Sequence, residues 1–305
     1  MKKLFISLTV LFVLVMSACS NGSTDKKNDA KGSKSETITY QSENGKVEVP
    51  ANPKRVVVLS SFAGNVMSLD VNLVGVDSWS KQNPRFDSKL KDVAEVSDEN
   101  VEKIAELNPD LIIGLSNIKN VDKLKKIAPT VTYTYGKVDY LTQHLEIGKL
   151  LNKEKEATTW VDAFKKRAQE AGKEIKAKIG EDATVSVVEN FNKQLYVYGE
   201  NWGRGTEILY QEMKLKMPEK VKEKALKEGY YALSTEVLPE FAGDYLIVSK
   251  NKETDNSFQE TESYKNIPAV KNNRVYEANM MEFYFNDPLT LDFQLDFFKK
   301  NFLGK

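Results

Sequence analysis

The sequence is poor in the residues that bind metal ions or form disulfides. Among 305 residues it has one histidine, His144, and one cysteine, Cys19. One cysteine cannot close an intrachain disulfide, and a zinc or manganese site rich in histidine is not available. His144 lies in the helical pattern YLTQHLEIGKLL, so we interpret it as a surface or packing residue.

The chain also lacks an excess of either charge and the signatures of hydrolases. Its 44 lysines and arginines balance 44 aspartates and glutamates. A surface that follows a nucleic-acid backbone would show a basic excess, so we expect no nucleic-acid partner. No G-x-S-x-G sequence occurs and His144 has no placed partner, so we do not expect an enzyme.

The chain has a single long apolar run, which lies at its start. Leu4–Met16 follows two lysines and is apolar except for two hydroxyl residues. This run is shorter than the about 20 residues that a transmembrane helix needs, but it suits an export signal. We therefore predict a signal peptide over residues 1–18. Residues 20–36 contain no large apolar side chain, so we interpret residues 19–36, which begin with Cys19, as a flexible tether.

Residues 37–305 show strands alternating with helices. The pattern KRVVVLS predicts a buried strand, and DENVEKIAELNPDLIIGL predicts a helix capped at Asp98 and followed by a second strand. VDKLKKIAPTVTYTY predicts the same unit again, with a helix halted near Pro129 and a strand that carries Tyr133 and Tyr135. Such alternation predicts an α/β fold in which helices cover a parallel sheet.

One long helix interrupts this pattern. From Lys153 to Lys178, apolar residues recur at steps of three and four, which predicts one helix of roughly 39 Å. It could be a surface helix of a single domain or a rigid strut between two lobes. Because residues 37–305 reach the size at which one core stops growing, we predict an N-terminal lobe over 37–152, an interlobe helix over 153–179 and a C-terminal lobe over 180–305.

The β/α alternation restarts after the long helix. TVSVVEN, QLYVYG, DYLIVS and NRVYEA predict strands, and Asp287 and Pro288 predict the start of a final helix. The segment VYGENWGRGTEILYQ holds Trp202 and Arg204 among three glycines before a helix. It matches neither a P-loop nor a dinucleotide fingerprint, so these two residues need another explanation than a bound phosphate.

Five segments together resemble one protein family. ANPKRVVVLS, VEKIAELNPDLII, KLKKIAPTV, LYVYGENWGRGTEILYQ and FNDPLTLDF resemble the iron-siderophore binding lipoproteins of Gram-positive ABC importers, in order, over residues 38–305. YGENWGRG with NDPLTLDF resembles the ferric hydroxamate receptors of the FhuD type. The resemblance implies a class III periplasmic-binding-protein-like fold, in which one long helix bridges two Rossmann-like lobes and the ligand lies between them.

The resemblance implies that the ligand is an Fe(III)-siderophore, with no intrinsic cofactor and no direct protein ligand to the iron. A ferric trihydroxamate is neutral at the metal and has apolar arms, so it suits a concave aromatic wall with a few fixed donors. By the resemblance, Arg204 donates hydrogen bonds to hydroxamate oxygens. Two tyrosines are added as candidates because they share side-chain parity with pocket tyrosines on their strands. The predicted ligand-binding residues are Trp202, Arg204, Tyr135, Tyr196 and Tyr284, with Tyr198 and Tyr133 added.

Other ligands of the same fold stay open as alternatives. The chain has five arginines and only Arg204 lies in a pocket motif, whereas a citrate-type or catecholate siderophore should need several cationic donors. Lysines could supply that charge, so these siderophores are not excluded. Haem is a further alternative, with Tyr135, Tyr284 or Met280 as its axial ligand, and so is cobalamin. A purely structural surface protein would leave the YGENWGRG loop unexplained.

The resemblance also implies a membrane anchor and a transport partner. VMSAC resembles the bacterial lipoprotein box, which implies that Cys19 receives two acyl chains, enough for stable anchoring. We expect a monomer on the outer face of the cytoplasmic membrane that delivers its ligand to an ABC permease with a cytoplasmic ATPase. Glu102 and Glu236, one in each lobe, match glutamates that family members use to dock this permease.

Overall fold

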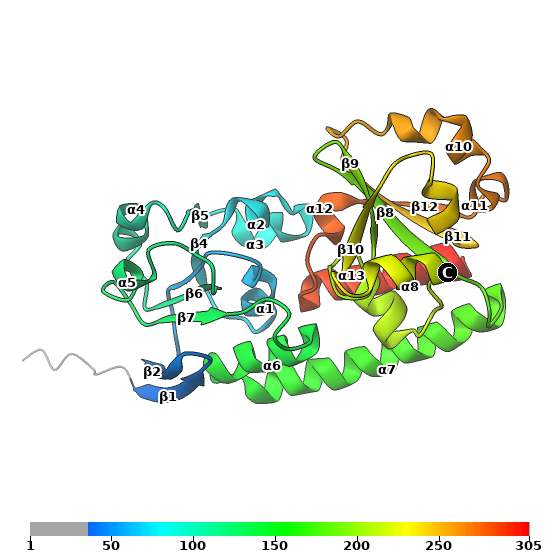
Figure 1. Ribbon diagram of the computed structural model, residues 1–305. Helices are drawn as coiled ribbons and strands as arrows, with labels where there is room; N and C mark the ends of the chain where they lie inside the picture. Colours follow the sequence, from blue (N-terminus) through cyan, green and yellow to red (C-terminus); the bar gives the residue numbers. More distant parts are fainter. Residues whose placement is uncertain (1–35, 305) are drawn as a thin grey trace, which may run out of the picture. The chain divides into compact units, whose positions relative to one another are not determined.

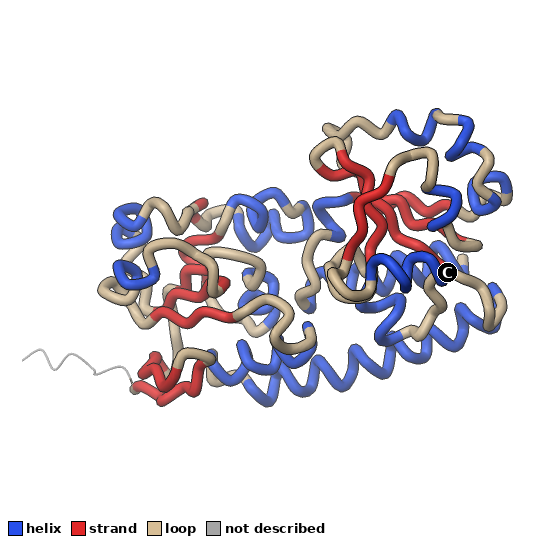
Figure 2. Tube along the Cα trace, in the orientation of Figure 1, coloured by secondary structure: helices blue, strands red, loops and turns tan. Residues whose placement is uncertain are grey.

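Two β-sheets and one long helix organise residues 36–304, which are the residues that the computed structural model describes (Figure 1). Figure 2 shows the strands gathered in two main groups with helices around them. The predicted signal peptide and Cys19 lie outside the described residues, and so does the predicted tether up to residue 35. The α/β class predicted from the sequence is confirmed.

The first large sheet is wholly parallel, as predicted, with the strand order β5-β4-β3-β6-β7. Val57 packs with Ile104 of α4 on one face, whereas Val56 and Val58 pack with a separate cluster on the other face. Both faces are therefore buried, which explains the continuous apolar run in β3. The elements are β1 (Thr37–Ser42) and β2 (Gly45–Pro50), which form an antiparallel hairpin, then β3 (Val56–Val58), α1 (Ala63–Ser68), β4 (Leu73–Val76), α2 (Ser78–Gln82), η1 (Pro84–Phe86), α3 (Asp87–Leu90), β5 (Ala94–Glu95), α4 (Val101–Glu106), β6 (Leu111–Leu115), α5 (Val121–Leu124), β7 (Thr130–Tyr133) and α6 (Tyr140–Leu150).

Two helices of this lobe differ from the prediction. Asn100 caps α4, because its side chain accepts a hydrogen bond from the backbone N–H of Lys103 at 3.0 Å. Asp98, the predicted cap, instead accepts a backbone hydrogen bond from the loop before α5. Helix α5 ends at Leu124, well before Pro129. The predicted helices exist, but their boundaries were wrong.

Helix α7 (Glu154–Ile179) is the predicted strut. Its 26 residues span about 39 Å at 1.5 Å per residue. One face, which includes Val161 and Phe164, is buried, and the helix packs against α6 of the first lobe and against η2 and η4 of the second. Because one helix serves both lobes, the alternative of a surface helix on a single domain is wrong.

The second large sheet is mixed, with the order β10-β9-β8-β11-β12. Strands β8, β11 and β12 are parallel, but β9 runs antiparallel to β8 and β10. Only Asn192 and Lys193 connect β8 to β9, and both have positive φ angles, as in a tight hairpin turn. Two residues are too few for a parallel crossover. The elements are β8 (Val185–Phe191), β9 (Gln194–Tyr198), η2 (Glu207–Glu212), α8 (Glu219–Ala225), β10 (Tyr230–Leu233), α9 (Leu238–Phe241), β11 (Tyr245–Lys250), η3 (Ser257–Glu260), α10 (Glu262–Lys265), α11 (Pro268–Lys271), β12 (Val275–Asn279), α12 (Met280–Phe283), α13 (Pro288–Phe298) and η4 (Lys299–Leu303).

After α12 the chain returns to the first lobe. Phe285 stacks on Phe86 with ring centroids 5.9 Å apart and belongs to the core of that lobe. Asp287 caps α13, as predicted, and accepts two backbone hydrogen bonds. Its carboxylate lies so close to α1 that a Cβ on Gly64 would come within 2.0 Å of it. The lobes are therefore joined by this packed crossing, which was not predicted from the sequence, as well as by α7.

Candidate functional site

The carboxyl ends of the parallel strands in the two lobes meet between the lobes. Trp79, which follows β4, stacks on Tyr284 with centroids 4.7 Å apart and lies 6.3 Å from the ring of Phe191 at the end of β8. Tyr135, which follows β7, contacts Trp202 of the second lobe. In open α/β sheets, ligands bind beyond the carboxyl ends of the strands. This interlobe region is therefore the candidate site.

An exposed aromatic cluster lies on one side of the region and consists of Tyr135, Trp202, Tyr230 and Tyr196. The Tyr135 and Trp202 rings meet edge to face at 5.3 Å, and Trp202 lies 5.2 Å from Tyr230, which contacts Tyr196 at 5.8 Å. Tyr135 is 41% exposed and Trp202 is 37% exposed. Large aromatic rings that contact each other and still face solvent are typical of a surface that binds a partly apolar ligand.

Arg204 lies behind this cluster and is only 5% exposed. Its Nη2 donates to Glu189 Oε1 at 2.8 Å, and its Nε lies 3.3 Å from both carboxylate oxygens. Burial alone lowers the pKa of Arg204, but the Glu189 carboxylate reverses that effect, so the net shift of this pKa is upward. Glu189 is fully buried and also accepts hydrogen bonds from Tyr198 and Ser249. The guanidinium is therefore a fixed positive charge in the interior.

Two aromatic rings lie against the Arg204 guanidinium. Its central carbon lies 4.6 Å from the Tyr284 ring centroid and 4.8 Å from the Tyr198 centroid. Because Trp79 stacks on Tyr284, the four side chains Trp79, Tyr284, Arg204 and Tyr198 form a continuous stack, which we call the arginine column. A cation over an aromatic face is attracted by the ring quadrupole, more strongly when it is desolvated. The column links the first lobe to the second.

The glycines around Arg204 form a tight left-handed turn. Gly203, Arg204 and Gly205 have φ angles of 72°, 60° and 77°. A Cβ on Gly203 would lie 2.5 Å from the carbonyl oxygen of Tyr284, and the Arg204 N–H donates to the Phe283 carbonyl at 2.8 Å. The glycines therefore permit close backbone packing between the loop and the α12–α13 segment. This explains their presence without a bound phosphate.

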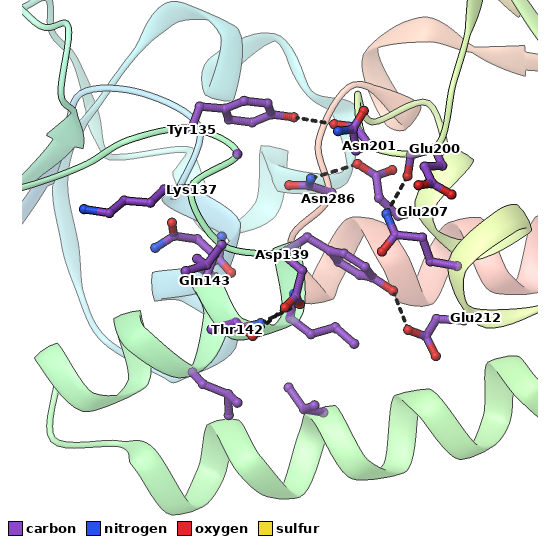
Figure 3. A pocket seen from close by; sticks show the side chains of 18 of the residues that line it. Tyr135, Lys137, Asp139, Thr142, Gln143, Glu200, Asn201, Glu207, Glu212 and Asn286 are labelled. Atoms are coloured by element: carbon purple, nitrogen blue, oxygen red, sulfur yellow. Dashed lines mark hydrogen bonds between the residues drawn. The ribbon is translucent and has the colours of Figure 1, made fainter. Parts of the chain in front are cut away.

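An interlobe cavity of about 710 Å³ lies beside the aromatic cluster (Figure 3). Its lining comes from both lobes and from α6, α7 and η2. Figure 3 shows Tyr135 extending across it toward Asn201, whose carbonyl oxygen lies 3.5 Å from the tyrosine hydroxyl. Tyr135 is the one predicted ligand-binding residue in this lining, and the other six lie outside it. Burial raises the pKa of the Tyr135 hydroxyl, although much of the ring is exposed.

Two buried carboxylates face the interlobe cavity. Glu207 Oε1 accepts hydrogen bonds from the Gly203 N–H at 2.9 Å and from Asn286 Nδ2 at 3.0 Å, and burial raises the pKa of this carboxyl. Glu212 is 8% exposed and accepts one hydrogen bond, from the Tyr140 hydroxyl at 3.3 Å. The cavity is therefore polar, unlike the aromatic cluster.

The two added candidates, Tyr133 and Tyr198, have different surroundings. Tyr133 is 2% exposed, packs edge to face on Phe62 at 5.5 Å and lies 3.1 Å from the Tyr40 hydroxyl. Tyr133 is therefore packed in the core of the first lobe in the ligand-free chain, and its role as a ligand contact stays a prediction. The parity argument fails because β7 ends at Tyr133, so Tyr135 does not continue the strand. Tyr198 is buried in the arginine column, whereas Tyr196 is partly exposed in the aromatic cluster.

The remaining predicted residues lie away from the aromatic cluster. Glu102 on α4 and Glu236 between β10 and α9 are both exposed, one in each lobe. His144 is buried, and its Nδ1 lies 3.1 Å from Asn65 Oδ1, so its interpretation as a packing residue is confirmed. Burial lowers the pKa of His144 to about 4. Within residues 36–304, no group of three or more His, Cys, Asp or Glu side chains is placed to hold a metal ion.

Three residues of the site region were not predicted from the sequence. Tyr230 comes from the edge strand β10, Trp79 from the short helix α2, and Glu189 from the end of β8. Glu189 had a detectable signal, because a carboxylate in the apolar strand pattern TVSVVEN needs a buried partner. Trp79 and Tyr230 had none, because they meet the site only through long-range packing.

Comparisons with known proteins agree with this geometry. A family model described as periplasmic binding protein matches residues 64–280. The chain is 37% identical over 295 residues to the iron(3+)-hydroxamate-binding protein FhuD of Bacillus subtilis (strain 168), which covers 94% of this chain and 93% of that relative.

Two solved structures are similar over most of the described residues. The FhuD protein from S. pseudintermedius has a TM-score of 0.81 and 38% identity, and the match covers 88% of this chain and 99% of that chain. FhuD2 from Staphylococcus aureus with bound ferrioxamine B has a TM-score of 0.79 and 36% identity, with coverages of 83% and 99%. These similarities confirm the predicted fold, two lobes bridged by a long helix.

Proposed function

The chain belongs to the periplasmic binding protein family, and from that premise we propose that it binds ferric hydroxamate siderophores between its two lobes. One relative is named for iron(3+)-hydroxamate binding, and FhuD2 has been solved with bound ferrioxamine B. The observation that carries the proposal is the exposed aromatic cluster, which lies directly beside a single buried arginine. That combination suits an iron complex that is neutral at the metal and apolar in its arms.

The aromatic cluster supplies the wall of the proposed site. The rings of Trp202, Tyr135 and Tyr230 are large, rigid and exposed, so they lose apolar surface to the ligand at little cost in side-chain entropy. Tyr196 extends the wall, and Tyr284 presents its ring from the arginine column. The siderophore keeps all of its bonds to iron, so the protein binds it without covalent chemistry and acts as a receptor and not as an enzyme.

Arg204 supplies the fixed donor of the proposed site. Its guanidinium has five N–H groups, and Nε, one N–H of Nη2 and one N–H of Nη1 bond to Glu189 and to the Trp202 carbonyl. The remaining N–H groups on Nη1 and Nη2 can donate to hydroxamate oxygens once the Tyr284 ring, on which Trp79 stacks, moves aside. Glu189 holds the fork in place, so the donors are oriented before the ligand arrives.

Delivery to a permease completes the proposed function. Glu102 and Glu236 are exposed on separate lobes, so they can orient the receptor on a two-fold ABC permease that is driven by a cytoplasmic ATPase. We place the receptor, as a monomer, on the outer face of the cytoplasmic membrane, tethered through a lipidated Cys19. Every helix within residues 36–304 is too short or too polar to cross a bilayer. Glu102→Ala with Glu236→Ala should reduce cellular iron uptake while siderophore affinity is unchanged.

Parallel calorimetric titrations test the ligand class. The chain from residue 36 is titrated with ferrichrome, ferrioxamine B, a ferric catecholate, a ferric citrate-type siderophore and haem. Saturable binding of the two hydroxamates, tighter than that of the other ligands, is the expected result. Tighter binding of an anionic siderophore or of haem would contradict the hydroxamate assignment, and binding of none would contradict siderophore binding altogether.

A further inference from the structure

Glu212 is a buried carboxylate without a counter-charge. It is 8% exposed, yet no lysine or arginine nitrogen of residues 36–304 lies within 4.0 Å of it. Its Oε1 accepts the single hydrogen bond from Tyr140, and its Oε2 has no partner in the part of the chain that the structure describes. Oε2 is not among the buried unpartnered atoms of the described residues, so it opens into the cavity that Glu212 lines.

Three other buried carboxylates of this region have ion-pair or hydrogen-bond partners within the protein. Glu189 forms the ion pair with Arg204 at 2.8 Å. Glu207 accepts a backbone and an amide hydrogen bond, and Asp287 caps α13. Glu212 alone among these four faces the interlobe cavity with a free oxygen. Glu212 therefore offers an open acceptor to a donor that enters the cavity.

A second side chain in the cavity is also unpartnered. Gln143 of α6 lines the cavity, and its amide Nε2 is buried without an acceptor in the described residues. Gln143 and Glu212 come from opposite lobes, and Figure 3 shows them on opposite sides of the space that Tyr135 spans. One amide donor and one carboxylate acceptor suit a chain that carries both a carbonyl oxygen and a cationic end.

The cavity lies within reach of a ligand held at the aromatic cluster. Tyr135 lines the cavity with one part of its side chain, and its ring lies 5.3 Å from the ring of Trp202. A molecule that rests on Trp202 is therefore separated from the cavity by about the width of one aromatic ring. A flexible arm of that molecule can enter where Tyr135 turns aside.

We propose that the interlobe cavity is a subsite for a protonated primary amine on an arm of the siderophore, which Glu212 binds while the Tyr140 hydroxyl orients the carboxylate. The proposal rests on the proposed function, because the arm belongs to the hydroxamate held at the aromatic cluster. An alkylammonium brings three N–H donors, and Glu212 Oε2 accepts one of them. Lys137, Lys165 and Lys214 also line the cavity, and within the described residues none of the three forms an ion pair with Glu212.

A matched pair of ligands tests the subsite. Ferrioxamine B ends in a protonated amine, and its N-acetylated derivative has the same iron centre without that charge. The wild-type chain should bind the amine form about tenfold more tightly, the scale of one charge-assisted hydrogen bond in a buried site. Glu212→Gln keeps the acceptor for Tyr140 and should remove this preference, while affinity for the acetylated form stays unchanged. Glu200→Gln is the control, because Glu200 lines the same cavity but is exposed.

The outcomes separate the subsite from the proposed function. Equal binding of both forms by the wild-type chain would overturn the subsite and leave hydroxamate binding intact. An equal loss of affinity for both forms in Glu212→Gln would show a structural role and would also overturn it. Binding of neither form would overturn the proposed function itself. Thermal unfolding of each variant confirms that the binding data come from folded protein.

Discussion

The exposed aromatic cluster and the arginine column are neighbours, but different forces hold them in place. The cluster consists of rings that contact each other at 5.2 to 5.8 Å and remain open to solvent. The column is closed by the buried ion pair of Arg204 with Glu189 and by the Tyr198 and Tyr284 rings against the guanidinium. Changes in the cluster should therefore affect binding, whereas changes in the column should affect folding first.

The contrast between an exposed cluster and a buried column explains how a receptor can hold a neutral ligand with one cation. If Arg204 were exposed, its charge would be hydrated and its orientation free. Burial beside Glu189 fixes the orientation of the guanidinium and removes its charge from solvent. The glycine turn brings the backbone close enough to α12 for Arg204 to be buried in this way. The exposed rings then supply the contact area, and the column supplies the rigidity.

Removing the counter-charge in the column should have the largest effect. Glu189→Gln leaves the Arg204 charge buried and unpaired, so we expect the free energy of unfolding to fall by about 3–5 kcal/mol. Urea denaturation of the ligand-free chain measures this. The double variant with Arg204→Met should recover part of the loss, because it removes the isolated charge. A loss below about 1 kcal/mol in the single variant, the range of surface pairs, would contradict a buried ion pair.

The buried interior should also show in the pH dependence of stability. Burial lowers the pKa of His144 from 6.5 to about 4, so the unfolded chain takes up a proton in this interval and the folded chain does not. Stability from this group is present above pH 6.5 and is lost as the pH falls toward 4, by up to about 3 kcal/mol. Asp287 has the opposite effect on stability. Burial raises its pKa from 3.8 to about 6, so between these values the folded chain binds a proton that the unfolded chain does not, and stability from this group rises as the pH falls.

The His144 effect is isolated by a variant. His144→Gln should lower stability at neutral pH but should lose stability less steeply than the wild-type chain between pH 6.5 and pH 4. Thermal unfolding of both proteins across this range measures the difference in slope. Parallel curves would mean that His144 titrates normally and is not buried as described.

An exposed ring should affect binding more than folding. Trp202→Ala removes the centre of the aromatic cluster, so affinity for a ferric hydroxamate should fall by about 2 kcal/mol, the scale of an interface hot spot. The stability of the ligand-free chain should change by less than about 1 kcal/mol, because the ring is 37% exposed. A large loss of stability with little loss of affinity would contradict the conclusion that the aromatic cluster acts in binding and not in folding.

Two glycines allow a smaller and sharper test. Gly203 and Gly136 have φ angles of 72° and 74°, but a Cβ on Gly203 would strike the Tyr284 carbonyl at 2.5 Å, whereas a Cβ on Gly136 would meet nothing within 4 Å. Ala at either position pays the same backbone strain, about 1–2 kcal/mol. Chemical denaturation should show an additional loss of about 1 kcal/mol or more for Gly203→Ala from the steric contact. Equal losses would mean that the loop does not pack closely on α12.

Local features of this fold could be predicted from the sequence, and long-range ones could not. The periodicity of α7, the Asp287 cap and the strands β3 and β6 depend on neighbouring residues, so one segment contains the whole signal. The pairing of Glu189 with Arg204 joins two separate strand and loop segments. The packing of Phe285 into the first lobe joins residues still farther apart in the chain.

The candidate site follows the same division. Trp202 was recognised from its motif and is exposed, whereas the motif gave no sign that Arg204 would be buried, because its burial depends on Glu189, Tyr198 and Tyr284. The parity rule that linked Tyr133 to Tyr135 does not hold, because β7 ends at Tyr133. Whether the predicted residues bind the ligand stays a prediction for the experiments above.

The most direct test of the central claim is the fluorescence of Trp202 alone. The chain has three tryptophans, Trp79, Trp160 and Trp202, so the variant Trp79→Phe with Trp160→Phe leaves one reporter. Titration with ferric hydroxamate should quench this emission strongly and saturably, because iron would lie close to the ring. Binding detected by calorimetry without quenching of Trp202 would place the ligand elsewhere and would contradict the proposed site.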